Sequence, residues 1–207
     1  MSRYTYEFES KNTELETYEW DNVWWEQTDR NDVSRALYIG DSISCAVRNL
    51  ATSCSNSKIL FDGFGTTKAL DNPFFFDSIR LFAKQQRYRN VVLFNNGLHG
   101  WHLDDDTQYP CYYEKMVKFL LDEFNDTPIV IVLTTSVANT EREQRVKRRN
   151  EAAIKIAHKY GLPIIDLYSV SVESSKFRSA DGVHFEIDGY EKFAKQIVCD
   201  LKNIKFK

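Results

Sequence analysis

Residues 36–43 read ALYIGDSI, and this stretch decides the fold. An apolar run stops abruptly at Gly40-Asp41-Ser42, and the residues that follow have the pattern of a helix. Short buried strands of parallel sheets are continuous apolar runs, and open α/β sheets bind their ligands beyond the carboxyl ends of such strands. Ser42 is therefore predicted to lie at the mouth of a sheet, with its backbone N–H at a helix start that favours negative charge. Such a serine can attack a carbonyl group and help to hold the resulting oxyanion.

A simpler interpretation is that Asp41 or Ser42 only caps the helix, since Asp and Ser are favoured capping residues. The other end of the chain favours chemistry, because DGVHF, residues 181–185, precedes an amphipathic helix. Asp181 and His184 are three residues apart in this loop. A loop of this kind can place an imidazole over the serine while the carboxylate orients the ring.

A Gly-Asp-Ser near the N-terminus and an Asp-x-x-His near the C-terminus resemble the SGNH (GDSL-type) esterases and lipases. The resemblance extends from Ala36 to Leu201. It implies that Ser42 is the nucleophile, that Asp181 and His184 complete a catalytic triad, and that a Gly and an Asn from two intervening blocks donate to the oxyanion. Because a shared fold does not establish a function, each of these roles needs support from the residues themselves.

From Ala36 onward, apolar strands alternate with helical patterns, which indicates a parallel sheet. The predicted strands are residues 36–40, 58–62, 90–95, 128–134 and 163–167. Right-handed crossovers then give an α/β fold, a three-layer α/β/α sandwich around a five-stranded parallel sheet. The resemblance implies the flavodoxin-like strand order 2-1-3-4-5. A chain of 207 residues suits one such domain, predicted as residues 36–207, with residues 1–35 as an aromatic-rich extension packed on it.

The second predicted strand leads into GFGTT, residues 63–67, where two glycines allow a tight turn and a close approach to a ligand. Gly65 aligns best with the glycine donor of the family, and Gly63 is the alternative. An ordinary glycine turn explains this loop equally well without the resemblance.

The third strand leads into GLHG, residues 97–100, where the family has G-x-N-D. The strand register puts His99 in the place of the Asn. Since an imidazole N–H can donate to an oxyanion as an amide N–H does, His99 is the predicted donor. Asn96 or Asn95 takes this role if the loop is offset. A loop histidine on its own more often bonds to the backbone.

Three other clusters have simpler interpretations than a binding site. Trp20 and Trp24 would share one face of a helix, which favours a packed aromatic flap and leaves sugar stacking as the alternative. Asp104-Asp105-Asp106 is more typical of a helix start than of a metal site. REQRVKRR, residues 142–149, mixes both charges on a helical period and is predicted to be a solvated helix face.

Composition limits the function further. A net charge of −3 argues against nucleic-acid and anionic-membrane partners, which call for a concentrated basic surface. The first residues lack the apolar core of a signal peptide, and no apolar run is long enough to span a membrane, so the chain is predicted to be cytoplasmic. The cysteines are widely spaced, which indicates reduced thiols and no metal site: Cys45, Cys54, Cys111 and Cys199.

These features together predict a serine esterase that hydrolyses a small acyl ester, with an acetyl ester of a carbohydrate favoured, without a metal or cofactor. Asp41 and Trp101 are predicted substrate contacts. An acyltransferase that uses the same serine, a lysophospholipase or a thioesterase would have the same motifs. A noncatalytic flavodoxin-like module is the alternative from another class. The expected partner is a small-molecule or saccharide ester, and the sequence does not indicate an oligomeric state.

Overall fold

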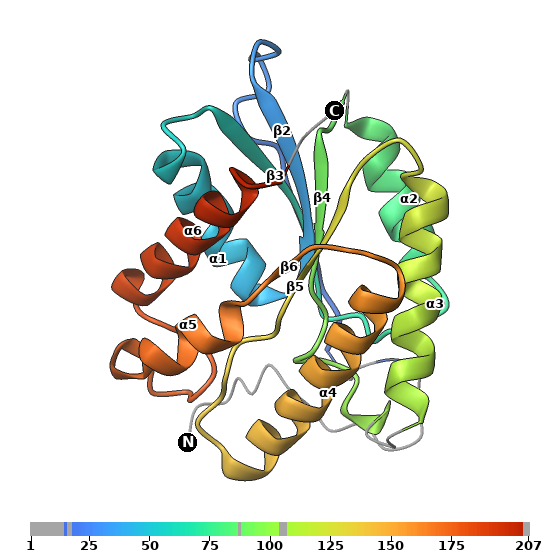
Figure 1. Ribbon diagram of the computed structural model, residues 1–207, viewed down its shortest axis with the longest axis vertical. Coiled ribbons are helices and arrows are strands. Elements are labelled where there is room, and N and C mark those ends of the chain that lie inside the picture. The colour runs from blue at the N-terminus through green and yellow to red at the C-terminus, as the bar shows by residue number, and fades with distance from the viewer. Residues whose placement is uncertain (1–14, 16–17, 87, 104–106, 205–207) are drawn as a thin grey trace.

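The computed structural model describes residues 15, 18–86, 88–103 and 107–204. Among these residues, six strands form one sheet of order β1-β3-β2-β4-β5-β6. Helices cover both faces of this sheet, so the chain is a three-layer α/β/α sandwich as predicted (Figure 1). The strands are β1 (Asp21–Trp24), β2 (Ser34–Gly40), β3 (Ile59–Thr66), β4 (Val91–Phe94), β5 (Ile129–Val132) and β6 (Ile164–Ile165).

The two helical layers bury alternate side chains of the same strands. Ala36 and Tyr38 of β2 pack in the core that α1 and α6 cover, whereas Leu37 and Ile39 pack in the core beneath α2 and α3. Because both faces of β2 are buried, its sequence is a continuous apolar run. The first layer comprises α1 (Ser42–Cys54), α5 (Leu167–Glu173) and α6 (Ile187–Leu201), and the second α2 (Phe75–Gln85), α3 (Gln108–Glu123) and α4 (Thr140–Lys159).

The five strands from β2 to β6 are parallel to one another and lie in the order β3-β2-β4-β5-β6. In the numbering of the predicted strands this order is 2-1-3-4-5, so the predicted topology is confirmed. It places the carboxyl ends of β2, β3 and β4 side by side. The loops that follow these strands therefore meet at one edge of the sheet.

The sixth strand, β1, was not predicted and comes from the N-terminal segment. It pairs antiparallel with residues 63–66, which extends β3 beyond residue 62, where the sequence predicted that this strand ends. Trp20 and Trp24 consequently do not share a helix face, since Trp24 is the last residue of β1. Just after β1, the ring of Trp25 stacks on Phe82 of α2, with the ring centroids 4.3 Å apart.

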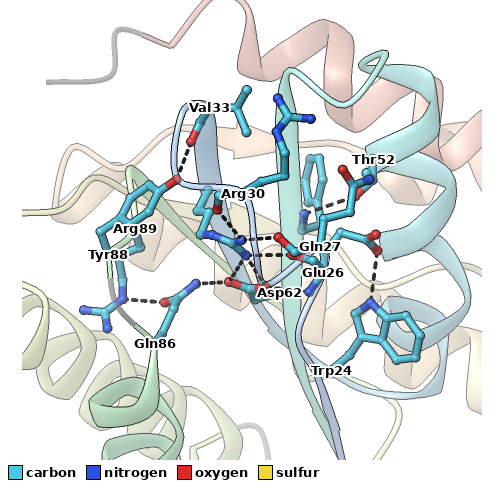
Figure 2. A network of polar contacts seen from close by, with 12 residues as sticks. Trp24, Glu26, Gln27, Arg30, Val33, Thr52, Asp62, Gln86, Tyr88 and Arg89 are labelled. Atoms are coloured by element: carbon cyan, nitrogen blue, oxygen red, sulfur yellow. Dashed lines mark hydrogen bonds and ion pairs between the residues drawn. The ribbon is translucent and has the colours of Figure 1, made fainter.

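Asp62 of β3 fastens the segment between β1 and β2 to the sheet (Figure 2). Its carboxylate accepts hydrogen bonds from Arg35 Nη1 at 2.8 and 3.0 Å, from the Glu26 backbone N–H at 2.8 Å and from Gln86 Nε2 at 2.6 Å. The Arg35 guanidinium in turn donates to the backbone carbonyls of Glu26 and Gln27, each at 2.9 Å. This buried ion pair fixes the path by which the chain leaves β1 and enters β2.

Asp104-Asp105-Asp106 lies outside the described residues. Within the described ranges, no helix combines the length and the apolar character that crossing a bilayer requires.

Candidate active site

Ser42 lies at the junction between β2 and α1, where the predicted strand-to-helix turn occurs. The Asp41 side chain caps α1 by accepting a hydrogen bond from the Ile43 N–H at 2.9 Å. Gly40 is required here because an added Cβ would lie 2.7 Å from the Ser44 Cβ. Since Asp41 provides the cap, the Ser42 hydroxyl is left for another partner. The Ser42 N–H belongs to the first helical turn, whose amides have no partner within the helix.

The partner of Ser42 is His184, which comes from the loop before α6. His184 Nε2 lies 2.7 Å from Ser42 Oγ, and His184 Nδ1 lies 2.6 Å from Asp181 Oδ2. The three residues therefore form a continuous Ser-His-Asp chain, although 142 positions separate Ser42 from His184. With the ring proton on Nδ1, Nε2 is oriented to accept the serine proton.

The loop around Asp181 holds its carboxylate in place. Asp181 Oδ1 accepts hydrogen bonds from the backbone N–H groups of Val183 and His184, both at 2.9 Å, and Gly182 has a φ of +78° that favours glycine. Partial burial acts to raise the pKa of Asp181, but these bonds and the His184 ring outweigh it and hold that pKa below its ordinary value. Asp181 is consequently a carboxylate at neutral pH, as the orienting member of a triad must be.

The structure does not support the predicted glycine donor. Gly65 lies inside β3, between Gly40 of β2 and Asn22 of β1. The Thr67 N–H donates to the Trp20 carbonyl at 3.3 Å. Because alternate residues of a strand direct their N–H groups to the same side, the Gly65 N–H also points toward β1 and away from β2. The alternative, Gly63, lies two positions before Gly65 on β3, so its N–H also points toward β1. The unpredicted strand β1 therefore explains why both assignments fail.

His99 has the features of an oxyanion donor. Its side chain is buried, with 4% of the residue exposed, and neither ring nitrogen has a hydrogen-bond partner among the described residues. Burial, reinforced by the charges of Arg149 and His184, lowers the pKa of His99 to about 3. The imidazole is therefore neutral and carries one N–H that no acceptor among the described residues uses.

The two alternative donors, Asn95 and Asn96, have hydrogen-bond partners of their own. The Asn95 amide donates to the Val132 carbonyl at 2.9 Å and to Thr134 Oγ1 at 3.1 Å, and the Asn96 amide donates to the Lys68 carbonyl at 3.0 Å. These bonds tie the end of β4 to its neighbours. Both N–H groups of the Asn95 amide are thus used, and one of the two on Asn96, which favours His99 as the donor.

The predicted substrate contacts are not at the surface. Asp41 is 1% exposed, and burial raises its pKa to about 6 even though the Ile43 N–H bond opposes that change. Trp101 is 4% exposed, and its ring lies against Arg149 and Arg145, whose guanidinium carbons are 4.4 and 5.7 Å from its centroid. Neither residue is placed to meet a substrate as predicted.

Trp20 is a better candidate for a substrate contact than either of these residues. An atom built at the Cβ position of Gly65 would lie 3.5 Å from the Trp20 ring and 3.4 Å from the Asp41 carbonyl oxygen. The half-buried indole is thus near the turn that carries Ser42. Sugar stacking was predicted for Trp20 only as an alternative, because the strand that places its ring here has no clear signal in the sequence.

Arg149 lies beside this site, at a position that differs from its prediction. It was predicted on a solvated helix face, yet only 3% of it is exposed, and it donates to carbonyls of the His99 loop. Its position in the helical period was the available signal. Arg149 lies three residues after Val146 and four before Ala153, both of which are buried.

No protein-family model matches the sequence, and neither does any curated protein. Solved structures do match. A member of the lipolytic protein G-D-S-L family from Veillonella parvula is 17% identical, with 83% of this chain and 100% of that one covered and a TM-score of 0.63. An acetyl xylan esterase is 15% identical (79% and 97% covered, TM-score 0.62).

The C-terminal catalytic domain of peptidoglycan O-acetyltransferase A from Streptococcus pneumoniae is also similar. It is 15% identical, the match covers 83% of this chain and 94% of that one, and the TM-score is 0.64. The match covers each of these chains almost from end to end. The similarity therefore extends over the whole sandwich and is not limited to a single motif. The chain therefore has the fold of the GDSL-type hydrolases.

Proposed function

We propose that the protein is a serine esterase of the SGNH family that hydrolyses small acyl esters. The observation that carries this proposal is the Ser42-His184-Asp181 chain, with links of 2.7 and 2.6 Å at the carboxyl edge of the sheet. A capping role alone does not explain it, because Asp41 provides the cap and His184 arrives from the other end of the sequence.

The geometry suits acyl transfer to water through a covalent intermediate. Ser42 Oγ attacks the ester carbonyl carbon while His184 Nε2 takes the hydroxyl proton. The tetrahedral oxyanion accepts hydrogen bonds from the Ser42 N–H and from the ring N–H of His99. Collapse breaks the bond to the alcohol, which leaves with the proton from His184. Water then attacks the acyl-serine in the same way, with His184 again as base, and releases the acid and Ser42.

The substrate class that we favour is an acetyl ester of a saccharide. Two of the similar structures are an acetyl xylan esterase and a peptidoglycan O-acetyltransferase, both named for acetyl groups on polysaccharides. Trp20 offers an aromatic face near the site, and indole faces suit stacking on sugar rings. A lysophospholipase or thioesterase would use the same residues on a different leaving group, so an ester panel separates these substrates.

An acyltransferase is the second candidate, because the peptidoglycan O-acetyltransferase has the same fold. It would differ only in passing the acyl group to a second alcohol instead of water. Acetate release from an acetyl donor, measured with and without a saccharide acceptor, distinguishes the two reactions. Hydrolysis predicts full acetate release in both conditions, whereas transfer predicts that acetylated acceptor replaces acetate.

The proposed function is tested by removing the two central groups of the triad. We expect Ser42→Ala and His184→Ala each to abolish hydrolysis of p-nitrophenyl acetate, and the double variant to be little worse than either one, because the residues act as a unit. Ser44→Ala is the matched control, since Ser44 is on the same helix and its hydroxyl donates a hydrogen bond to the Asp41 carbonyl, at 2.6 Å. If purified Ser42→Ala keeps most of the activity, the proposal is wrong.

A further inference from the structure

Arg149 is a buried cation that the proposed reaction does not use directly. It extends from α4 to the loop after β4 and donates hydrogen bonds to three backbone carbonyls of that loop. Its Nη1 donates to the carbonyls of Gly97 at 3.1 Å and His99 at 2.7 Å, and its Nη2 donates to the carbonyl of Gly100 at 2.7 Å. The guanidinium carbon lies 4.4 Å from the ring centroids of both Trp101 and Tyr109.

The loop needs such a partner because its conformation brings several carbonyl oxygens together. Gly100 has a φ of +68°, and an added Cβ there would lie 2.7 Å from the Ala69 Cβ. Converging carbonyl dipoles repel one another unless donors pair with them, and a buried carbonyl left unpaired is destabilising. The Tyr109 hydroxyl pairs with the Asn96 carbonyl in the same loop. Arg149 therefore determines the backbone geometry on both sides of His99.

The charge of Arg149 also acts on the His99 ring. Burial is the main cause of the lowered His99 pKa, and the positive charge of Arg149 is the next. A neutral His99 presents one N–H to the oxyanion. It also avoids placing a second imidazolium near His184 when that residue holds the proton from Ser42. The side chain of Arg149 thus influences both the position and the protonation state of His99.

We infer that Arg149 is a positioning residue, which holds the His99 loop in the conformation that directs the imidazole N–H at the oxyanion. This inference rests on the proposed esterase function and extends it to a residue that does not touch the substrate. Lysine cannot replace it fully, because a single ammonium group cannot reach three carbonyls with the planar fork of a guanidinium.

The test is a double-mutant cycle between Arg149 and His99, with Arg145→Met as the matched control. Arg145 is on the same helix and lies against the same Trp101 ring, but its side chain pairs with Glu141 at 2.9 Å. We expect Arg149→Met to lower kcat roughly 10²-fold and to change KM little, as for the loss of one preorganised donor. Arg145→Met should stay within about threefold of wild type.

The cycle separates positioning from general destabilisation. If Arg149 acts through His99, adding Arg149→Met to His99→Ala should cost less than about threefold further in kcat. Losses that multiply, or an Arg149→Met variant as active as Arg145→Met, would overturn the inference. Should Arg149→Met fail to fold, Arg149→Lys takes its place in the same cycle, because it keeps a cation in the buried site.

The outcome for Arg149 is distinguishable from the outcome for the esterase itself. If Ser42→Ala retains activity, the proposed function fails, whatever Arg149 does. If Ser42→Ala is inactive and the Arg149 and His99 losses multiply, only the positioning role fails.

Discussion

His99 is the residue at which this chain departs from the motif of the SGNH-type hydrolases that it resembles, so it provides the sharpest test of the proposed oxyanion site. We expect His99→Ala to lower kcat for p-nitrophenyl acetate roughly 10²-fold with little change in KM, because one preorganised donor is lost. His99→Asn should recover part of that loss, since an amide N–H can point into the same space. Asn95→Ala is the comparison, because the Asn95 amide is bonded to Val132 and Thr134 and should affect mainly stability. A nearly silent His99→Ala with a crippling Asn96→Ala would show that the donor is Asn96.

Asp41 gives a second prediction, about stability and pH. Burial raises its pKa from 3.8 to about 6 in the folded protein. Because the folded pKa is the higher one, the proton on Asp41 stabilises the fold below about pH 4, and this contribution is lost as the pH rises through about 6. Asp41→Asn keeps an acceptor for the Ile43 N–H without the charge. In urea unfolding it should therefore add up to about 3 kcal/mol of stability at about pH 7 and little at about pH 4. An equal effect at both pH values would contradict this account.

At the scale of the elements, β1 depends on the buried Arg35–Asp62 pair, whose charged atoms are 2.8 Å apart. Asp62→Ala leaves the Arg35 charge buried without its partner, so the free energy of unfolding should fall by about 3–5 kcal/mol. Urea unfolding measures this loss. The control is Asp32→Ala, which removes the exposed Arg30–Asp32 pair of the same segment and should have little effect. Equal losses for the two variants would show that Asp62 does not fasten the segment.

The same elements show how far the sequence alone predicts the structure. The five parallel strands were predictable because each is a buried apolar run between helical patterns. Strand β1 was not, because all four of its residues are exposed and it lacks the period-2 alternation of a half-buried strand. The missed strand also explains the failed Gly65 assignment. Because β1 pairs with β3, it occupies backbone N–H groups that would be available for an oxyanion if this stretch were a loop.

At the scale of the whole molecule, the sheet topology assembles a site from segments that are distant in sequence. Ser42 follows β2, His99 follows β4, and His184 precedes α6. The spacing within Asp181-x-x-His184 is visible in the sequence, but its approach to Ser42 is a result of the tertiary fold. The helical period is enough to predict that Arg149 is buried. It does not predict which atoms Arg149 bonds, because these are backbone carbonyls, which every residue has.

The central claim is that Ser42 is a nucleophile activated by His184, and covalent labelling tests it most directly. The protein is treated with a serine-reactive phosphonate, digested, and the modified peptide is located by mass spectrometry. We predict one adduct on Ser42, no adduct on Ser42→Ala, strongly slowed labelling of His184→Ala, and normal labelling of Ser44→Ala. Labelling at another residue, or labelling of Ser42 at an unchanged rate in His184→Ala, would contradict the account.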